Sequence, residues 1–348
     1  MTLVELAHEL NLSIATISRA LNRPDDVAPA TRERVLAAVH RNGHYQPGRP
    51  RSLRAQQTRT IGVVISDIRN YFFAAFVKSI EDQARANGYT ILICNADEDK
   101  EKEEAALRML LDRKVAGVIN CSTGGNLEML ELVRKSGAIL VDFDRESGLD
   151  HTDTITINNQ KGAELAVEHL TGLGHTRIAT IAGPQHLSNG RARLLGFQEA
   201  LAKRSIALPA NYIQIGNFQS ESGYSSSQRL LSLKHPPTAV FTANMEMGAG
   251  LIALVRERGI KLPEQLSIVT FDDGFWARYI DPPLTVIAQP VEAMGRFTID
   301  LMLKRLRGSR GAQRKMFAPK LIVRRSTAPV GTRSRASANR PDSLAADS

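Results

Sequence analysis

The stretch MTLVELAHELNLSIATISRALN (residues 1–22) has the pattern of two short helices separated at Asn11 and Leu12. The first helix has apolar residues at i, i+3 and i+4 spacing, namely Leu3, Leu6, Ala7 and Leu10. Ser13 can cap the second helix, whose Ile17 and Leu21 would face inward. This stretch therefore predicts two helices that pack through apolar faces.

A third helix is predicted from Pro29 to Asn42, because proline suits the first turn of a helix and Gly43 suits its end. Its apolar stripe would consist of Val35, Leu36 and Val39. Three short helices predict a small all-α helix-turn-helix domain over residues 1–45.

The second helix carries side chains suited to DNA at its N-terminal end. The residues that can donate hydrogen bonds to phosphates are Ser13, Thr16 and Ser18. Arg19 can reach a guanine, and Ile14 and Ala15 can contact thymine methyl groups. A generic helical hairpin remains an alternative, but the pattern favours a DNA reader.

A linker follows this domain. Residues 46–60, QPGRPRSLRAQQTRT, contain proline, glycine and arginine but only one large apolar residue, Leu53. That composition predicts a linker over residues 46–59. At the other end of the chain, Ser, Arg, Ala and Pro dominate from Gly331 onwards, which predicts a disordered tail over residues 331–348.

Between linker and tail, over residues 60–330, β-rich runs alternate with amphipathic segments, and this alternation predicts parallel sheets with crossover helices. The first expected strands are 61–66, 90–95, 117–121, 139–143 and 154–157, with helices at 71–87, 100–113 and 127–136. The pattern then restarts, with helices at 160–173, 190–204, 221–232 and 246–258 and strands at 177–182, 212–215, 239–242 and 267–271. We expect two similar α/β lobes.

The composition is that of an ordinary globular protein, with 43% hydrophobic and 23% charged residues. No apolar run of about 18 residues could span a bilayer, and the N-terminus lacks the pattern of a signal peptide. We therefore expect a cytoplasmic protein. Cys94 and Cys121 lie in apolar runs without metal-ligand spacing, which favours buried, reduced thiols.

The net charge of +9 is unevenly distributed. Residues 59–300 hold 25 basic and 29 acidic side chains, whereas residues 301–341 hold 12 basic side chains and no acidic ones. The C-terminal excess could assist DNA binding nonspecifically, or it could be a solvated helix face followed by disorder. Overall charge is therefore weak evidence for a nucleic-acid partner.

SIATISRALN (residues 13–22) resembles the recognition helix of the LacI/GalR family of bacterial repressors. VAPATRERVLAAVHRNGHYQP (residues 27–47) is similar to the family's third helix and its Tyr-x-Pro exit, and the likeness extends to about Val330. It implies a two-lobe, periplasmic-binding-protein-like domain after the helix-turn-helix. The DNA-binding residues expected on this basis are Ser13, Ile14, Ala15, Thr16, Ser18, Arg19, Asn22, Tyr45, Leu53 and Arg54.

The resemblance also implies a hinge helix at Arg51-Ser52-Leu53-Arg54, with Leu53 as a wedge in the minor groove. An apolar residue among arginines suits that role, because the wedge unstacks bases while the arginines neutralise phosphates. Gly48 departs from the family pattern, which usually has Asn there. We keep the hinge helix as a hypothesis.

Polar and aromatic residues at predicted strand ends are candidates for an effector pocket, because ligands of open α/β sheets bind beyond the carboxyl ends of the strands. They are Ser66, Phe72, Phe73, Asp142, Phe143, Arg193, Phe218, Asn244, Asp272 and Gln289. Taken singly, the Asp and Asn residues could cap turns and the aromatic residues could be core.

Three segments favour the pocket, because they look like the family's cleft segments: GPQHLSNGRARLLGF (183–197), TAVFTAN (238–244) and SIVTFDDG (267–274). Asn244-Met245 replaces the family's usual Asn-Asp pair, so one carboxylate is missing from that loop. Arg193 with Asp142 and Asp272 suits a pentose or hexose. A purine, a nucleoside or a sugar phosphate remains an alternative.

We therefore expect a ligand-responsive DNA-binding regulator that represses carbohydrate-metabolism genes. The expected partners are operator DNA, a small sugar effector and a second copy of the chain, with no cofactor, metal or membrane. Residues 71–80, YFFAAFVKSI, could contribute to a dimer interface or be buried within a lobe. A solute-binding protein of the same fold is an alternative. An enzyme is not expected, because no Gly-rich phosphate loop, metal cluster or nucleophile elbow is present.

Overall fold

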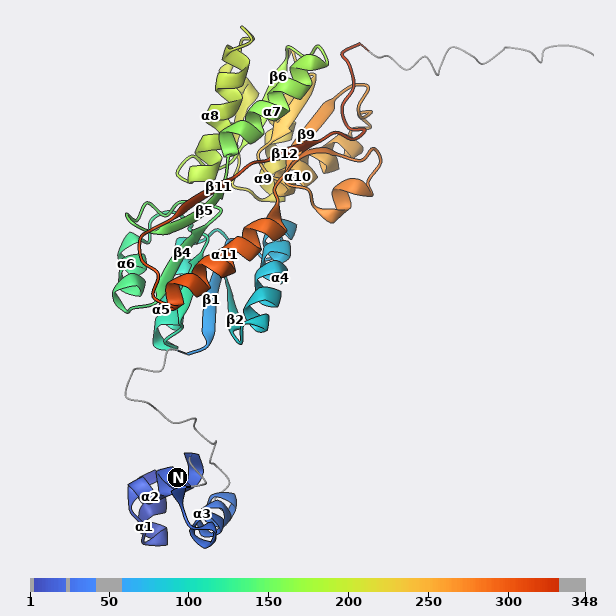
Figure 1. Ribbon diagram of the computed structural model, residues 1–348. Helices are drawn as coiled ribbons and strands as arrows, with labels where there is room; N and C mark the ends of the chain where they lie inside the picture. The colour runs from blue at the N-terminus through green and yellow to red at the C-terminus, as the bar shows by residue number, and fades with distance from the viewer. Residues whose placement is uncertain (1–2, 23–25, 42–57, 332–348) are drawn as a thin grey trace, which may run out of the picture. The chain divides into compact units, whose positions relative to one another are not determined.

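The computed structural model describes residues 3–22, 26–41 and 58–331, and the chain divides into two compact units, Met1–Gln57 and Thr58–Ser348 (Figure 1). The predicted linker up to Gln57, the contacts expected of Tyr45, Leu53 and Arg54, and the tail from residue 332 lie outside the described residues. Each unit is described separately below.

The first unit has three helices, α1 (Leu3–Leu10), α2 (Ile14–Asn22) and α3 (Pro29–Arg41). Ser13 caps α2 as predicted, because its Oγ accepts a hydrogen bond from the Thr16 amide at 3.0 Å. The buried residues of this unit are Leu6, Ala7, Leu10, Ile17, Ala20, Val35 and Ala38. The predicted stripe of α3 is wrong at Leu36, which is 37% exposed, since Ala38 occupies the buried face instead.

The second unit contains two six-stranded sheets, one in each lobe (Figure 1). The first-lobe sheet has the order β11-β5-β4-β3-β1-β2 and is parallel throughout. Its strands are β1 (Thr60–Ile65), β2 (Thr90–Asn95), β3 (Gly117–Asn120), β4 (Ile139–Phe143), β5 (Asp153–Ile157) and β11 (Arg314–Phe317). Its helices are α4 (Tyr71–Ala86), α5 (Lys100–Asp112), α6 (Leu127–Lys135) and α11 (Val291–Leu306).

The second-lobe sheet has the order β12-β10-β9-β8-β6-β7, with β12 antiparallel to β10 and the other pairs parallel. Its strands are β6 (Ile178–Ala182), β7 (Ile213–Ile215), β8 (Ala239–Thr242), β9 (Ser267–Phe271), β10 (Thr285–Ala288) and β12 (Lys320–Ile322). Its helices are α7 (Asn159–Gly172), α8 (Ser188–Ala202), α9 (Ser220–Leu231) and α10 (Met245–Glu257), with the short 3-10 turns η2 (Ala210–Tyr212) and η3 (Phe275–Arg278).

The two predicted lobes are present, but they are not consecutive halves of the chain. The chain crosses between them after β5, after β10 and after β11. Helix α11 therefore returns to the first lobe and packs along α4 (Figure 1), where Ser79 Oγ donates to the Glu292 carbonyl at 3.1 Å. A Cβ on Gly295 would lie 2.4 Å from Ser79 Oγ, so glycine permits this close approach of the two helices.

Both faces of the first-lobe sheet are covered, which explains the nearly continuous apolar runs of its strands. In β1, Val63 and Ile65 face a core that includes Phe76 and Met302, whereas Val64 faces a second core with Leu107. In the stretch 71–80, Phe72, Phe73, Phe76 and Ile80 are buried within the first lobe. Burial within the lobe, the second of the two alternatives for this stretch, accounts for these side chains.

Candidate functional site

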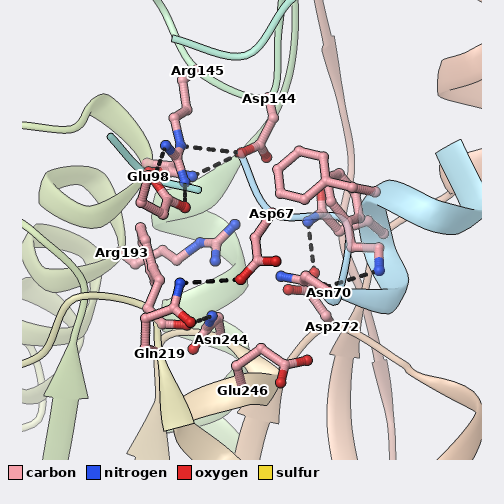
Figure 2. Close-up of a pocket in the computed structure, with 15 residues that line it drawn as sticks. Asp67, Asn70, Glu98, Asp144, Arg145, Arg193, Gln219, Asn244, Glu246 and Asp272 are labelled. Atoms are coloured by element: carbon pink, nitrogen blue, oxygen red, sulfur yellow. Dashed lines mark hydrogen bonds and ion pairs between the residues drawn. The ribbon is translucent and has the colours of Figure 1, made fainter. Parts of the chain in front are cut away.

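A polar cavity lies between the two lobes of the second unit, and we call it the central chamber (Figure 2). It is open to solvent, and its empty volume, solvent at the mouth included, is about 370 Å³. Its walls come mainly from loops and helix starts that follow β1, β2 and β4 in the first lobe and β6, β7, β8 and β9 in the second. This position agrees with the rule that open α/β sheets bind ligands beyond the carboxyl ends of their strands.

Seven of the ten residues predicted for the pocket line the central chamber: Phe72, Phe73, Arg193, Phe218, Asn244, Asp272 and Gln289. Three do not. Ser66 is buried with its Oγ 2.9 Å from Cys121 Sγ, and Phe143 stacks on Phe76 in the core at a centroid distance of 3.4 Å. Asp142 holds a turn, because its Oδ2 accepts from the amide and the hydroxyl of Ser147 at 2.8 and 2.6 Å.

The chamber contains eight further residues that the pattern of the sequence did not indicate. They are Asp67, Asn70, Glu98, Asp144, Arg145, Asn189, Gln219 and Glu246. Two of them directly follow residues that were predicted at strand ends: Asp67 follows Ser66, and Asp144 follows Phe143. Glu246 supplies a carboxylate to the loop in which one seemed to be missing, and burial raises its pKa.

Arg193 reaches the chamber from α8 and is fixed in place on two sides. Its guanidinium lies 3.6 Å from the centroid of the Phe271 ring. Its Nε donates to Asn159 Oδ1 at 2.8 Å, and its Nη1 donates to the carbonyl of Ala243. Nη2 has no hydrogen-bond partner within residues 58–331, so this nitrogen is available to a ligand. Burial lowers the pKa of Arg193.

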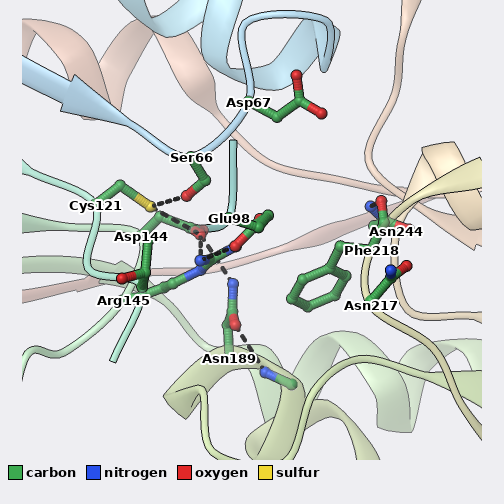
Figure 3. A network of polar contacts seen from close by, with 12 residues as sticks. Ser66, Asp67, Glu98, Cys121, Asp144, Arg145, Asn189, Asn217, Phe218 and Asn244 are labelled. Carbon is green, nitrogen blue, oxygen red and sulfur yellow. Dashed lines mark hydrogen bonds and ion pairs between the residues drawn. The ribbon is translucent and has the colours of Figure 1, made fainter. Parts of the chain in front are cut away.

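A buried ionic network forms another wall of the chamber (Figure 3). Arg145 forms a bidentate salt bridge with Glu98, in which Nη1 and Nη2 donate to the two carboxylate oxygens at 2.6 Å each. Asp144 Oδ2 accepts from Asn189 Nδ2 at 2.9 Å, and this hydrogen bond joins the two lobes. Asp144 Oδ1 is buried and has no partner among the residues that the structure describes. Burial raises the pKa of Asp144.

Asp272 lies directly after β9, at a positive φ of 77°. Its Oδ1 accepts from Gln289 Nε2 at 2.7 Å. Burial raises the pKa of Asp272 to about 6, although Arg193 and the Gln289 hydrogen bond act in the opposite direction. Asn244 caps α10 by accepting from the Met247 amide, and its Nδ2 donates to the Phe218 carbonyl.

The chamber therefore presents more acceptors than donors. Of its five carboxylates, Glu98 is paired with Arg145 and Asp67 with Arg69, which leaves Asp144, Glu246 and Asp272 facing the guanidinium of Arg193. Within the described ranges, no group of three or more His, Cys, Asp or Glu side chains is placed to hold a metal ion. A ligand that donates several hydrogen bonds fits this set of side chains best.

The candidate DNA-reading surface lies on α2 in the first unit. Ile14 is 49% exposed, and Ala15 and Arg19 are exposed beside it, while Ile17 and Ala20 are buried on the opposite face. Thr16 Oγ1 lies 2.8 Å from Ser13 Oγ. The side chains of Ser18 and Asn22 lie outside what the structure describes. One face of α2 thus packs in the unit while the other presents the predicted contact residues.

A three-helix unit with an exposed second helix, followed in the same chain by a two-lobe unit with a polar interlobe chamber, defines a DNA-binding regulator that responds to a small ligand. Residues 2–47 match the family described as bacterial regulatory proteins, lacI family, and residues 167–327 match a periplasmic binding protein-like domain. The repressor PurR of Klebsiella pneumoniae (strain 342) is 34% identical over 332 residues, which cover 94% of this chain and 97% of that protein. The chain therefore belongs to the LacI family of bacterial transcriptional regulators.

Solved structures agree with this assignment. The complex of the regulator CelR with cellobiose is 28% identical, has a TM-score of 0.72 and covers 94% of this chain and 99% of its own. A LacI family regulator from Enterococcus faecium with bound ribose is 31% identical, with a TM-score of 0.70 over 78% of this chain and 99% of its own. The protein is accordingly a ligand-responsive repressor with a helix-turn-helix and a two-lobe ligand-binding domain.

Proposed function

We propose that the central chamber binds a neutral, polyhydroxylated effector, a pentose or hexose, and that this binding modulates the affinity of a homodimer for operator DNA. The observation that carries the proposal is the excess of acceptors in the chamber. Asp144 Oδ1 and Gln289 Oε1 are buried there without partners in the described part of the chain. Sugar hydroxyls supply the donors that such oxygens need.

The same charges disfavour an anionic effector. Arg193 is the one guanidinium of the chamber that is not forked onto a carboxylate in the described residues, and Asp144 and Asp272 both lie close enough to affect its pKa. A phosphate would have to enter beside these carboxylates, at an electrostatic cost. A sugar can instead accept one hydrogen bond from Arg193 and donate to its acidic neighbours.

A purine is the second candidate, because the repressors that share 34% identity over 332 residues are named PurR. A nucleobase also carries N–H donors, and Phe72, Phe73 and Phe218 offer it aromatic surface. The ligand titration below separates the two candidates.

We further propose that Ile14, Ala15 and Arg19 of α2 contact base edges and that Ser13 and Thr16 contact phosphates. Ser13, Ile14, Ala15 and Arg19 are exposed and Thr16 is half-buried. They lie on the outer face and at the cap of α2, which packs inward through Ile17 and Ala20, and this placement supports these roles. Two copies would place two such helices on half-sites one helical turn apart. We place the protein in the cytoplasm with DNA and assign it no catalytic activity. None of the described helices is long and apolar enough to cross a membrane.

The test is a thermal-shift screen of the full-length chain with pentoses, hexoses, purine bases and nucleosides, followed by calorimetric titration of any hit. Ligands that bind the folded state raise the melting temperature by mass action. A sugar should give the largest shift, and Arg193→Met should abolish it. A shift with purines alone would replace the sugar by the second candidate. DNA binding is scored separately, by fluorescence anisotropy on the upstream region of the protein's own gene.

A further inference from the structure

A second cavity adjoins the central chamber, and we call it the rim chamber. Its empty volume, open solvent included, is about 310 Å³, and it shares four wall residues with the central chamber: Asn70, Phe72, Asp272 and Gln289. Because these four residues form part of the walls of both cavities, one ligand could extend from one into the other. The rim chamber adds Tyr71 and Val291 from the first lobe and Met245, Asp273 and Gly274 from the second. The Asp273 carboxylate is already paired with Arg278 and Arg324.

The added walls are largely apolar and aromatic. Tyr71, the first residue of α4, is 41% exposed, and Phe275 of η3 in the other lobe is 58% exposed. Their ring centroids lie 5.7 Å apart with an interplanar angle of 57°, so the two rings meet from opposite lobes beside the rim chamber. Together the two rings give an exposed aromatic surface at the edge of the cavity, of the kind that ligand-binding grooves present.

Met245 is held against this cavity by Gly274. The Gly274 amide donates to Met245 Sδ at 3.1 Å, and a Cβ on Gly274 would come within 2.4 Å of the same sulfur. Glycine at this position therefore permits the thioether to line the rim chamber. The result is a preformed apolar wall rather than a loop that happens to lie nearby.

The shared wall supplies polar atoms at the junction of the two cavities. Gln289 Nε2 is committed to Asp272 Oδ1 at 2.7 Å, which leaves Gln289 Oε1 buried and unpartnered within residues 58–331. Acceptors at the junction and apolar surface beyond it match a sugar ring, which has hydroxyls along its edge and C–H groups on its face.

We propose that the rim chamber is a subsite for a second sugar ring, so that the effector is a disaccharide whose first ring occupies the central chamber. This inference rests on the proposed sugar effector and specifies its class. The ring in the subsite would cover Tyr71 with its C–H face while its hydroxyls donate to Gln289 and Asp272. A flat nucleobase would favour two parallel rings, whereas Tyr71 and Phe275 are tilted against each other.

The test compares monosaccharides with their disaccharides on the full-length chain by calorimetry: glucose with cellobiose and maltose, galactose with lactose, and xylose with xylobiose. One disaccharide should bind at least about tenfold more tightly than its component monosaccharide. Tyr71→Ala and Val291→Phe should bring this ratio close to one while monosaccharide binding persists, the first by removing the stacking face and the second by filling the cavity. Tyr279→Ala is the matched control, because Tyr279 is 81% exposed and does not line the rim chamber.

The outcomes separate the two proposals. If a monosaccharide binds and no disaccharide binds more tightly, the subsite is overturned while the sugar effector stands. A disaccharide preference that survives both Tyr71→Ala and Val291→Phe also overturns the subsite. If purines bind and no sugar does, both proposals fail.

Discussion

The carboxamide of Gln219 donates to the carboxylate of Asp67 across 3.1 Å, and this hydrogen bond joins the two lobes of the ligand-binding unit (Figure 2). Arg69 Nη2 donates to Gln219 Oε1 at 2.9 Å and also contacts Asp67. Burial acts to raise the pKa of Asp67, but the hydrogen bonds from Arg69 and Gln219 lower it overall. With the Asp144–Asn189 bond, these contacts hold the lobes together without any ligand.

Gln219→Ala should therefore weaken effector binding by about three- to tenfold, because lobe closure loses two partly exposed hydrogen bonds whose combined contribution is about 1 kcal/mol. Calorimetry measures the affinity, and small-angle scattering should show a larger unliganded ligand-binding unit. Gln214→Ala is the control, since Gln214 bonds to Arg229 within the second lobe. Equal affinities in both variants would show that the Gln219 contacts do not favour closure.

Arg193→Met should abolish measurable effector binding, a loss of about 100-fold or more, because the chamber loses its one uncommitted guanidinium donor. Stability should also fall, because methionine keeps much of the volume over Phe271 but leaves Asn159 Oδ1 and the Ala243 carbonyl without their donor and the buried Asp272 without its cationic neighbour. Titration calorimetry and thermal melts check the two effects. Arg191→Met on the same helix, at an exposed position, should leave both unchanged. Retained affinity in Arg193→Met would remove Arg193 from the site.

Effector affinity should fall as the pH drops through about 6. Burial raises the pKa of Asp272 to about 6, and hydroxyl donors bind its ionised form, so each pH unit below that value costs up to about tenfold in affinity. Asp272→Asn should reduce the pH dependence, and the part that remains is expected from Asp144 and Glu246, whose pKa values burial also raises. Asp142, whose pKa is also raised by burial to about 6, does not line the chamber, so Asp142→Asn should keep the profile of the parent protein.

Asp272 and Asp142 both affect stability, which falls as the pH rises, whereas effector affinity increases with pH. Their pKa values are higher in the folded chain than the ordinary value of 3.8. Their stabilising contribution is therefore complete below about pH 3.8 and is lost as the pH rises through about 6. Chemical unfolding of the unliganded protein between pH 5 and 7 should show a smaller decline in Asp142→Asn. An unchanged slope would indicate that Asp142 titrates normally.

Ile14→Ala should weaken binding to the specific operator by about tenfold and leave nonspecific DNA binding nearly unchanged, because a methyl contact to a base carries sequence information and no charge. Ile14 is 49% exposed, so thermal stability should not change. Leu36→Ala on α3 provides the control, since that side chain is also exposed in the same unit. Anisotropy titrations on operator and scrambled DNA check both variants; equal losses on the two DNAs would argue against base contact.

Glu103→Ala should destabilise the ligand-binding unit by about 3 kcal/mol, because it leaves buried donors unpaired. The Glu103 carboxylate accepts from Asn120 Nδ2 and Asn126 Nδ2 at 2.8 Å each and from the Thr123 amide at 3.1 Å. Urea unfolding measures the effect. Glu104→Ala removes only a surface salt bridge with Arg108, and it should lower the free energy of unfolding by less than about 0.5 kcal/mol.

The order and type of the elements over residues 60–271 could be predicted from the sequence, with bounds within about two residues of those in the structure. Hydrophobic periodicity is a local property, and each of these helices and strands carries its own. Which other helix or strand an element packs against is not a local property of its sequence. Nothing in the pattern of α11 indicates that it packs on α4, more than two hundred residues earlier, rather than on the strand that precedes it.

The same distinction holds for the site. The predicted strand ends indicated where the chamber lies, and seven of the ten predicted residues line it. The sequence alone could not decide between Asp142 and Asp144, because the chain leaves β4 and reaches a positive φ of 64° at Asp144, which sends the later carboxylate to the chamber and leaves the earlier one on Ser147. Local patterns along the chain were therefore sufficient to predict the class of protein and the strand ends near its ligand. Which side chains converge there follows from the tertiary fold, because convergence depends on how loops from the two sheets face each other.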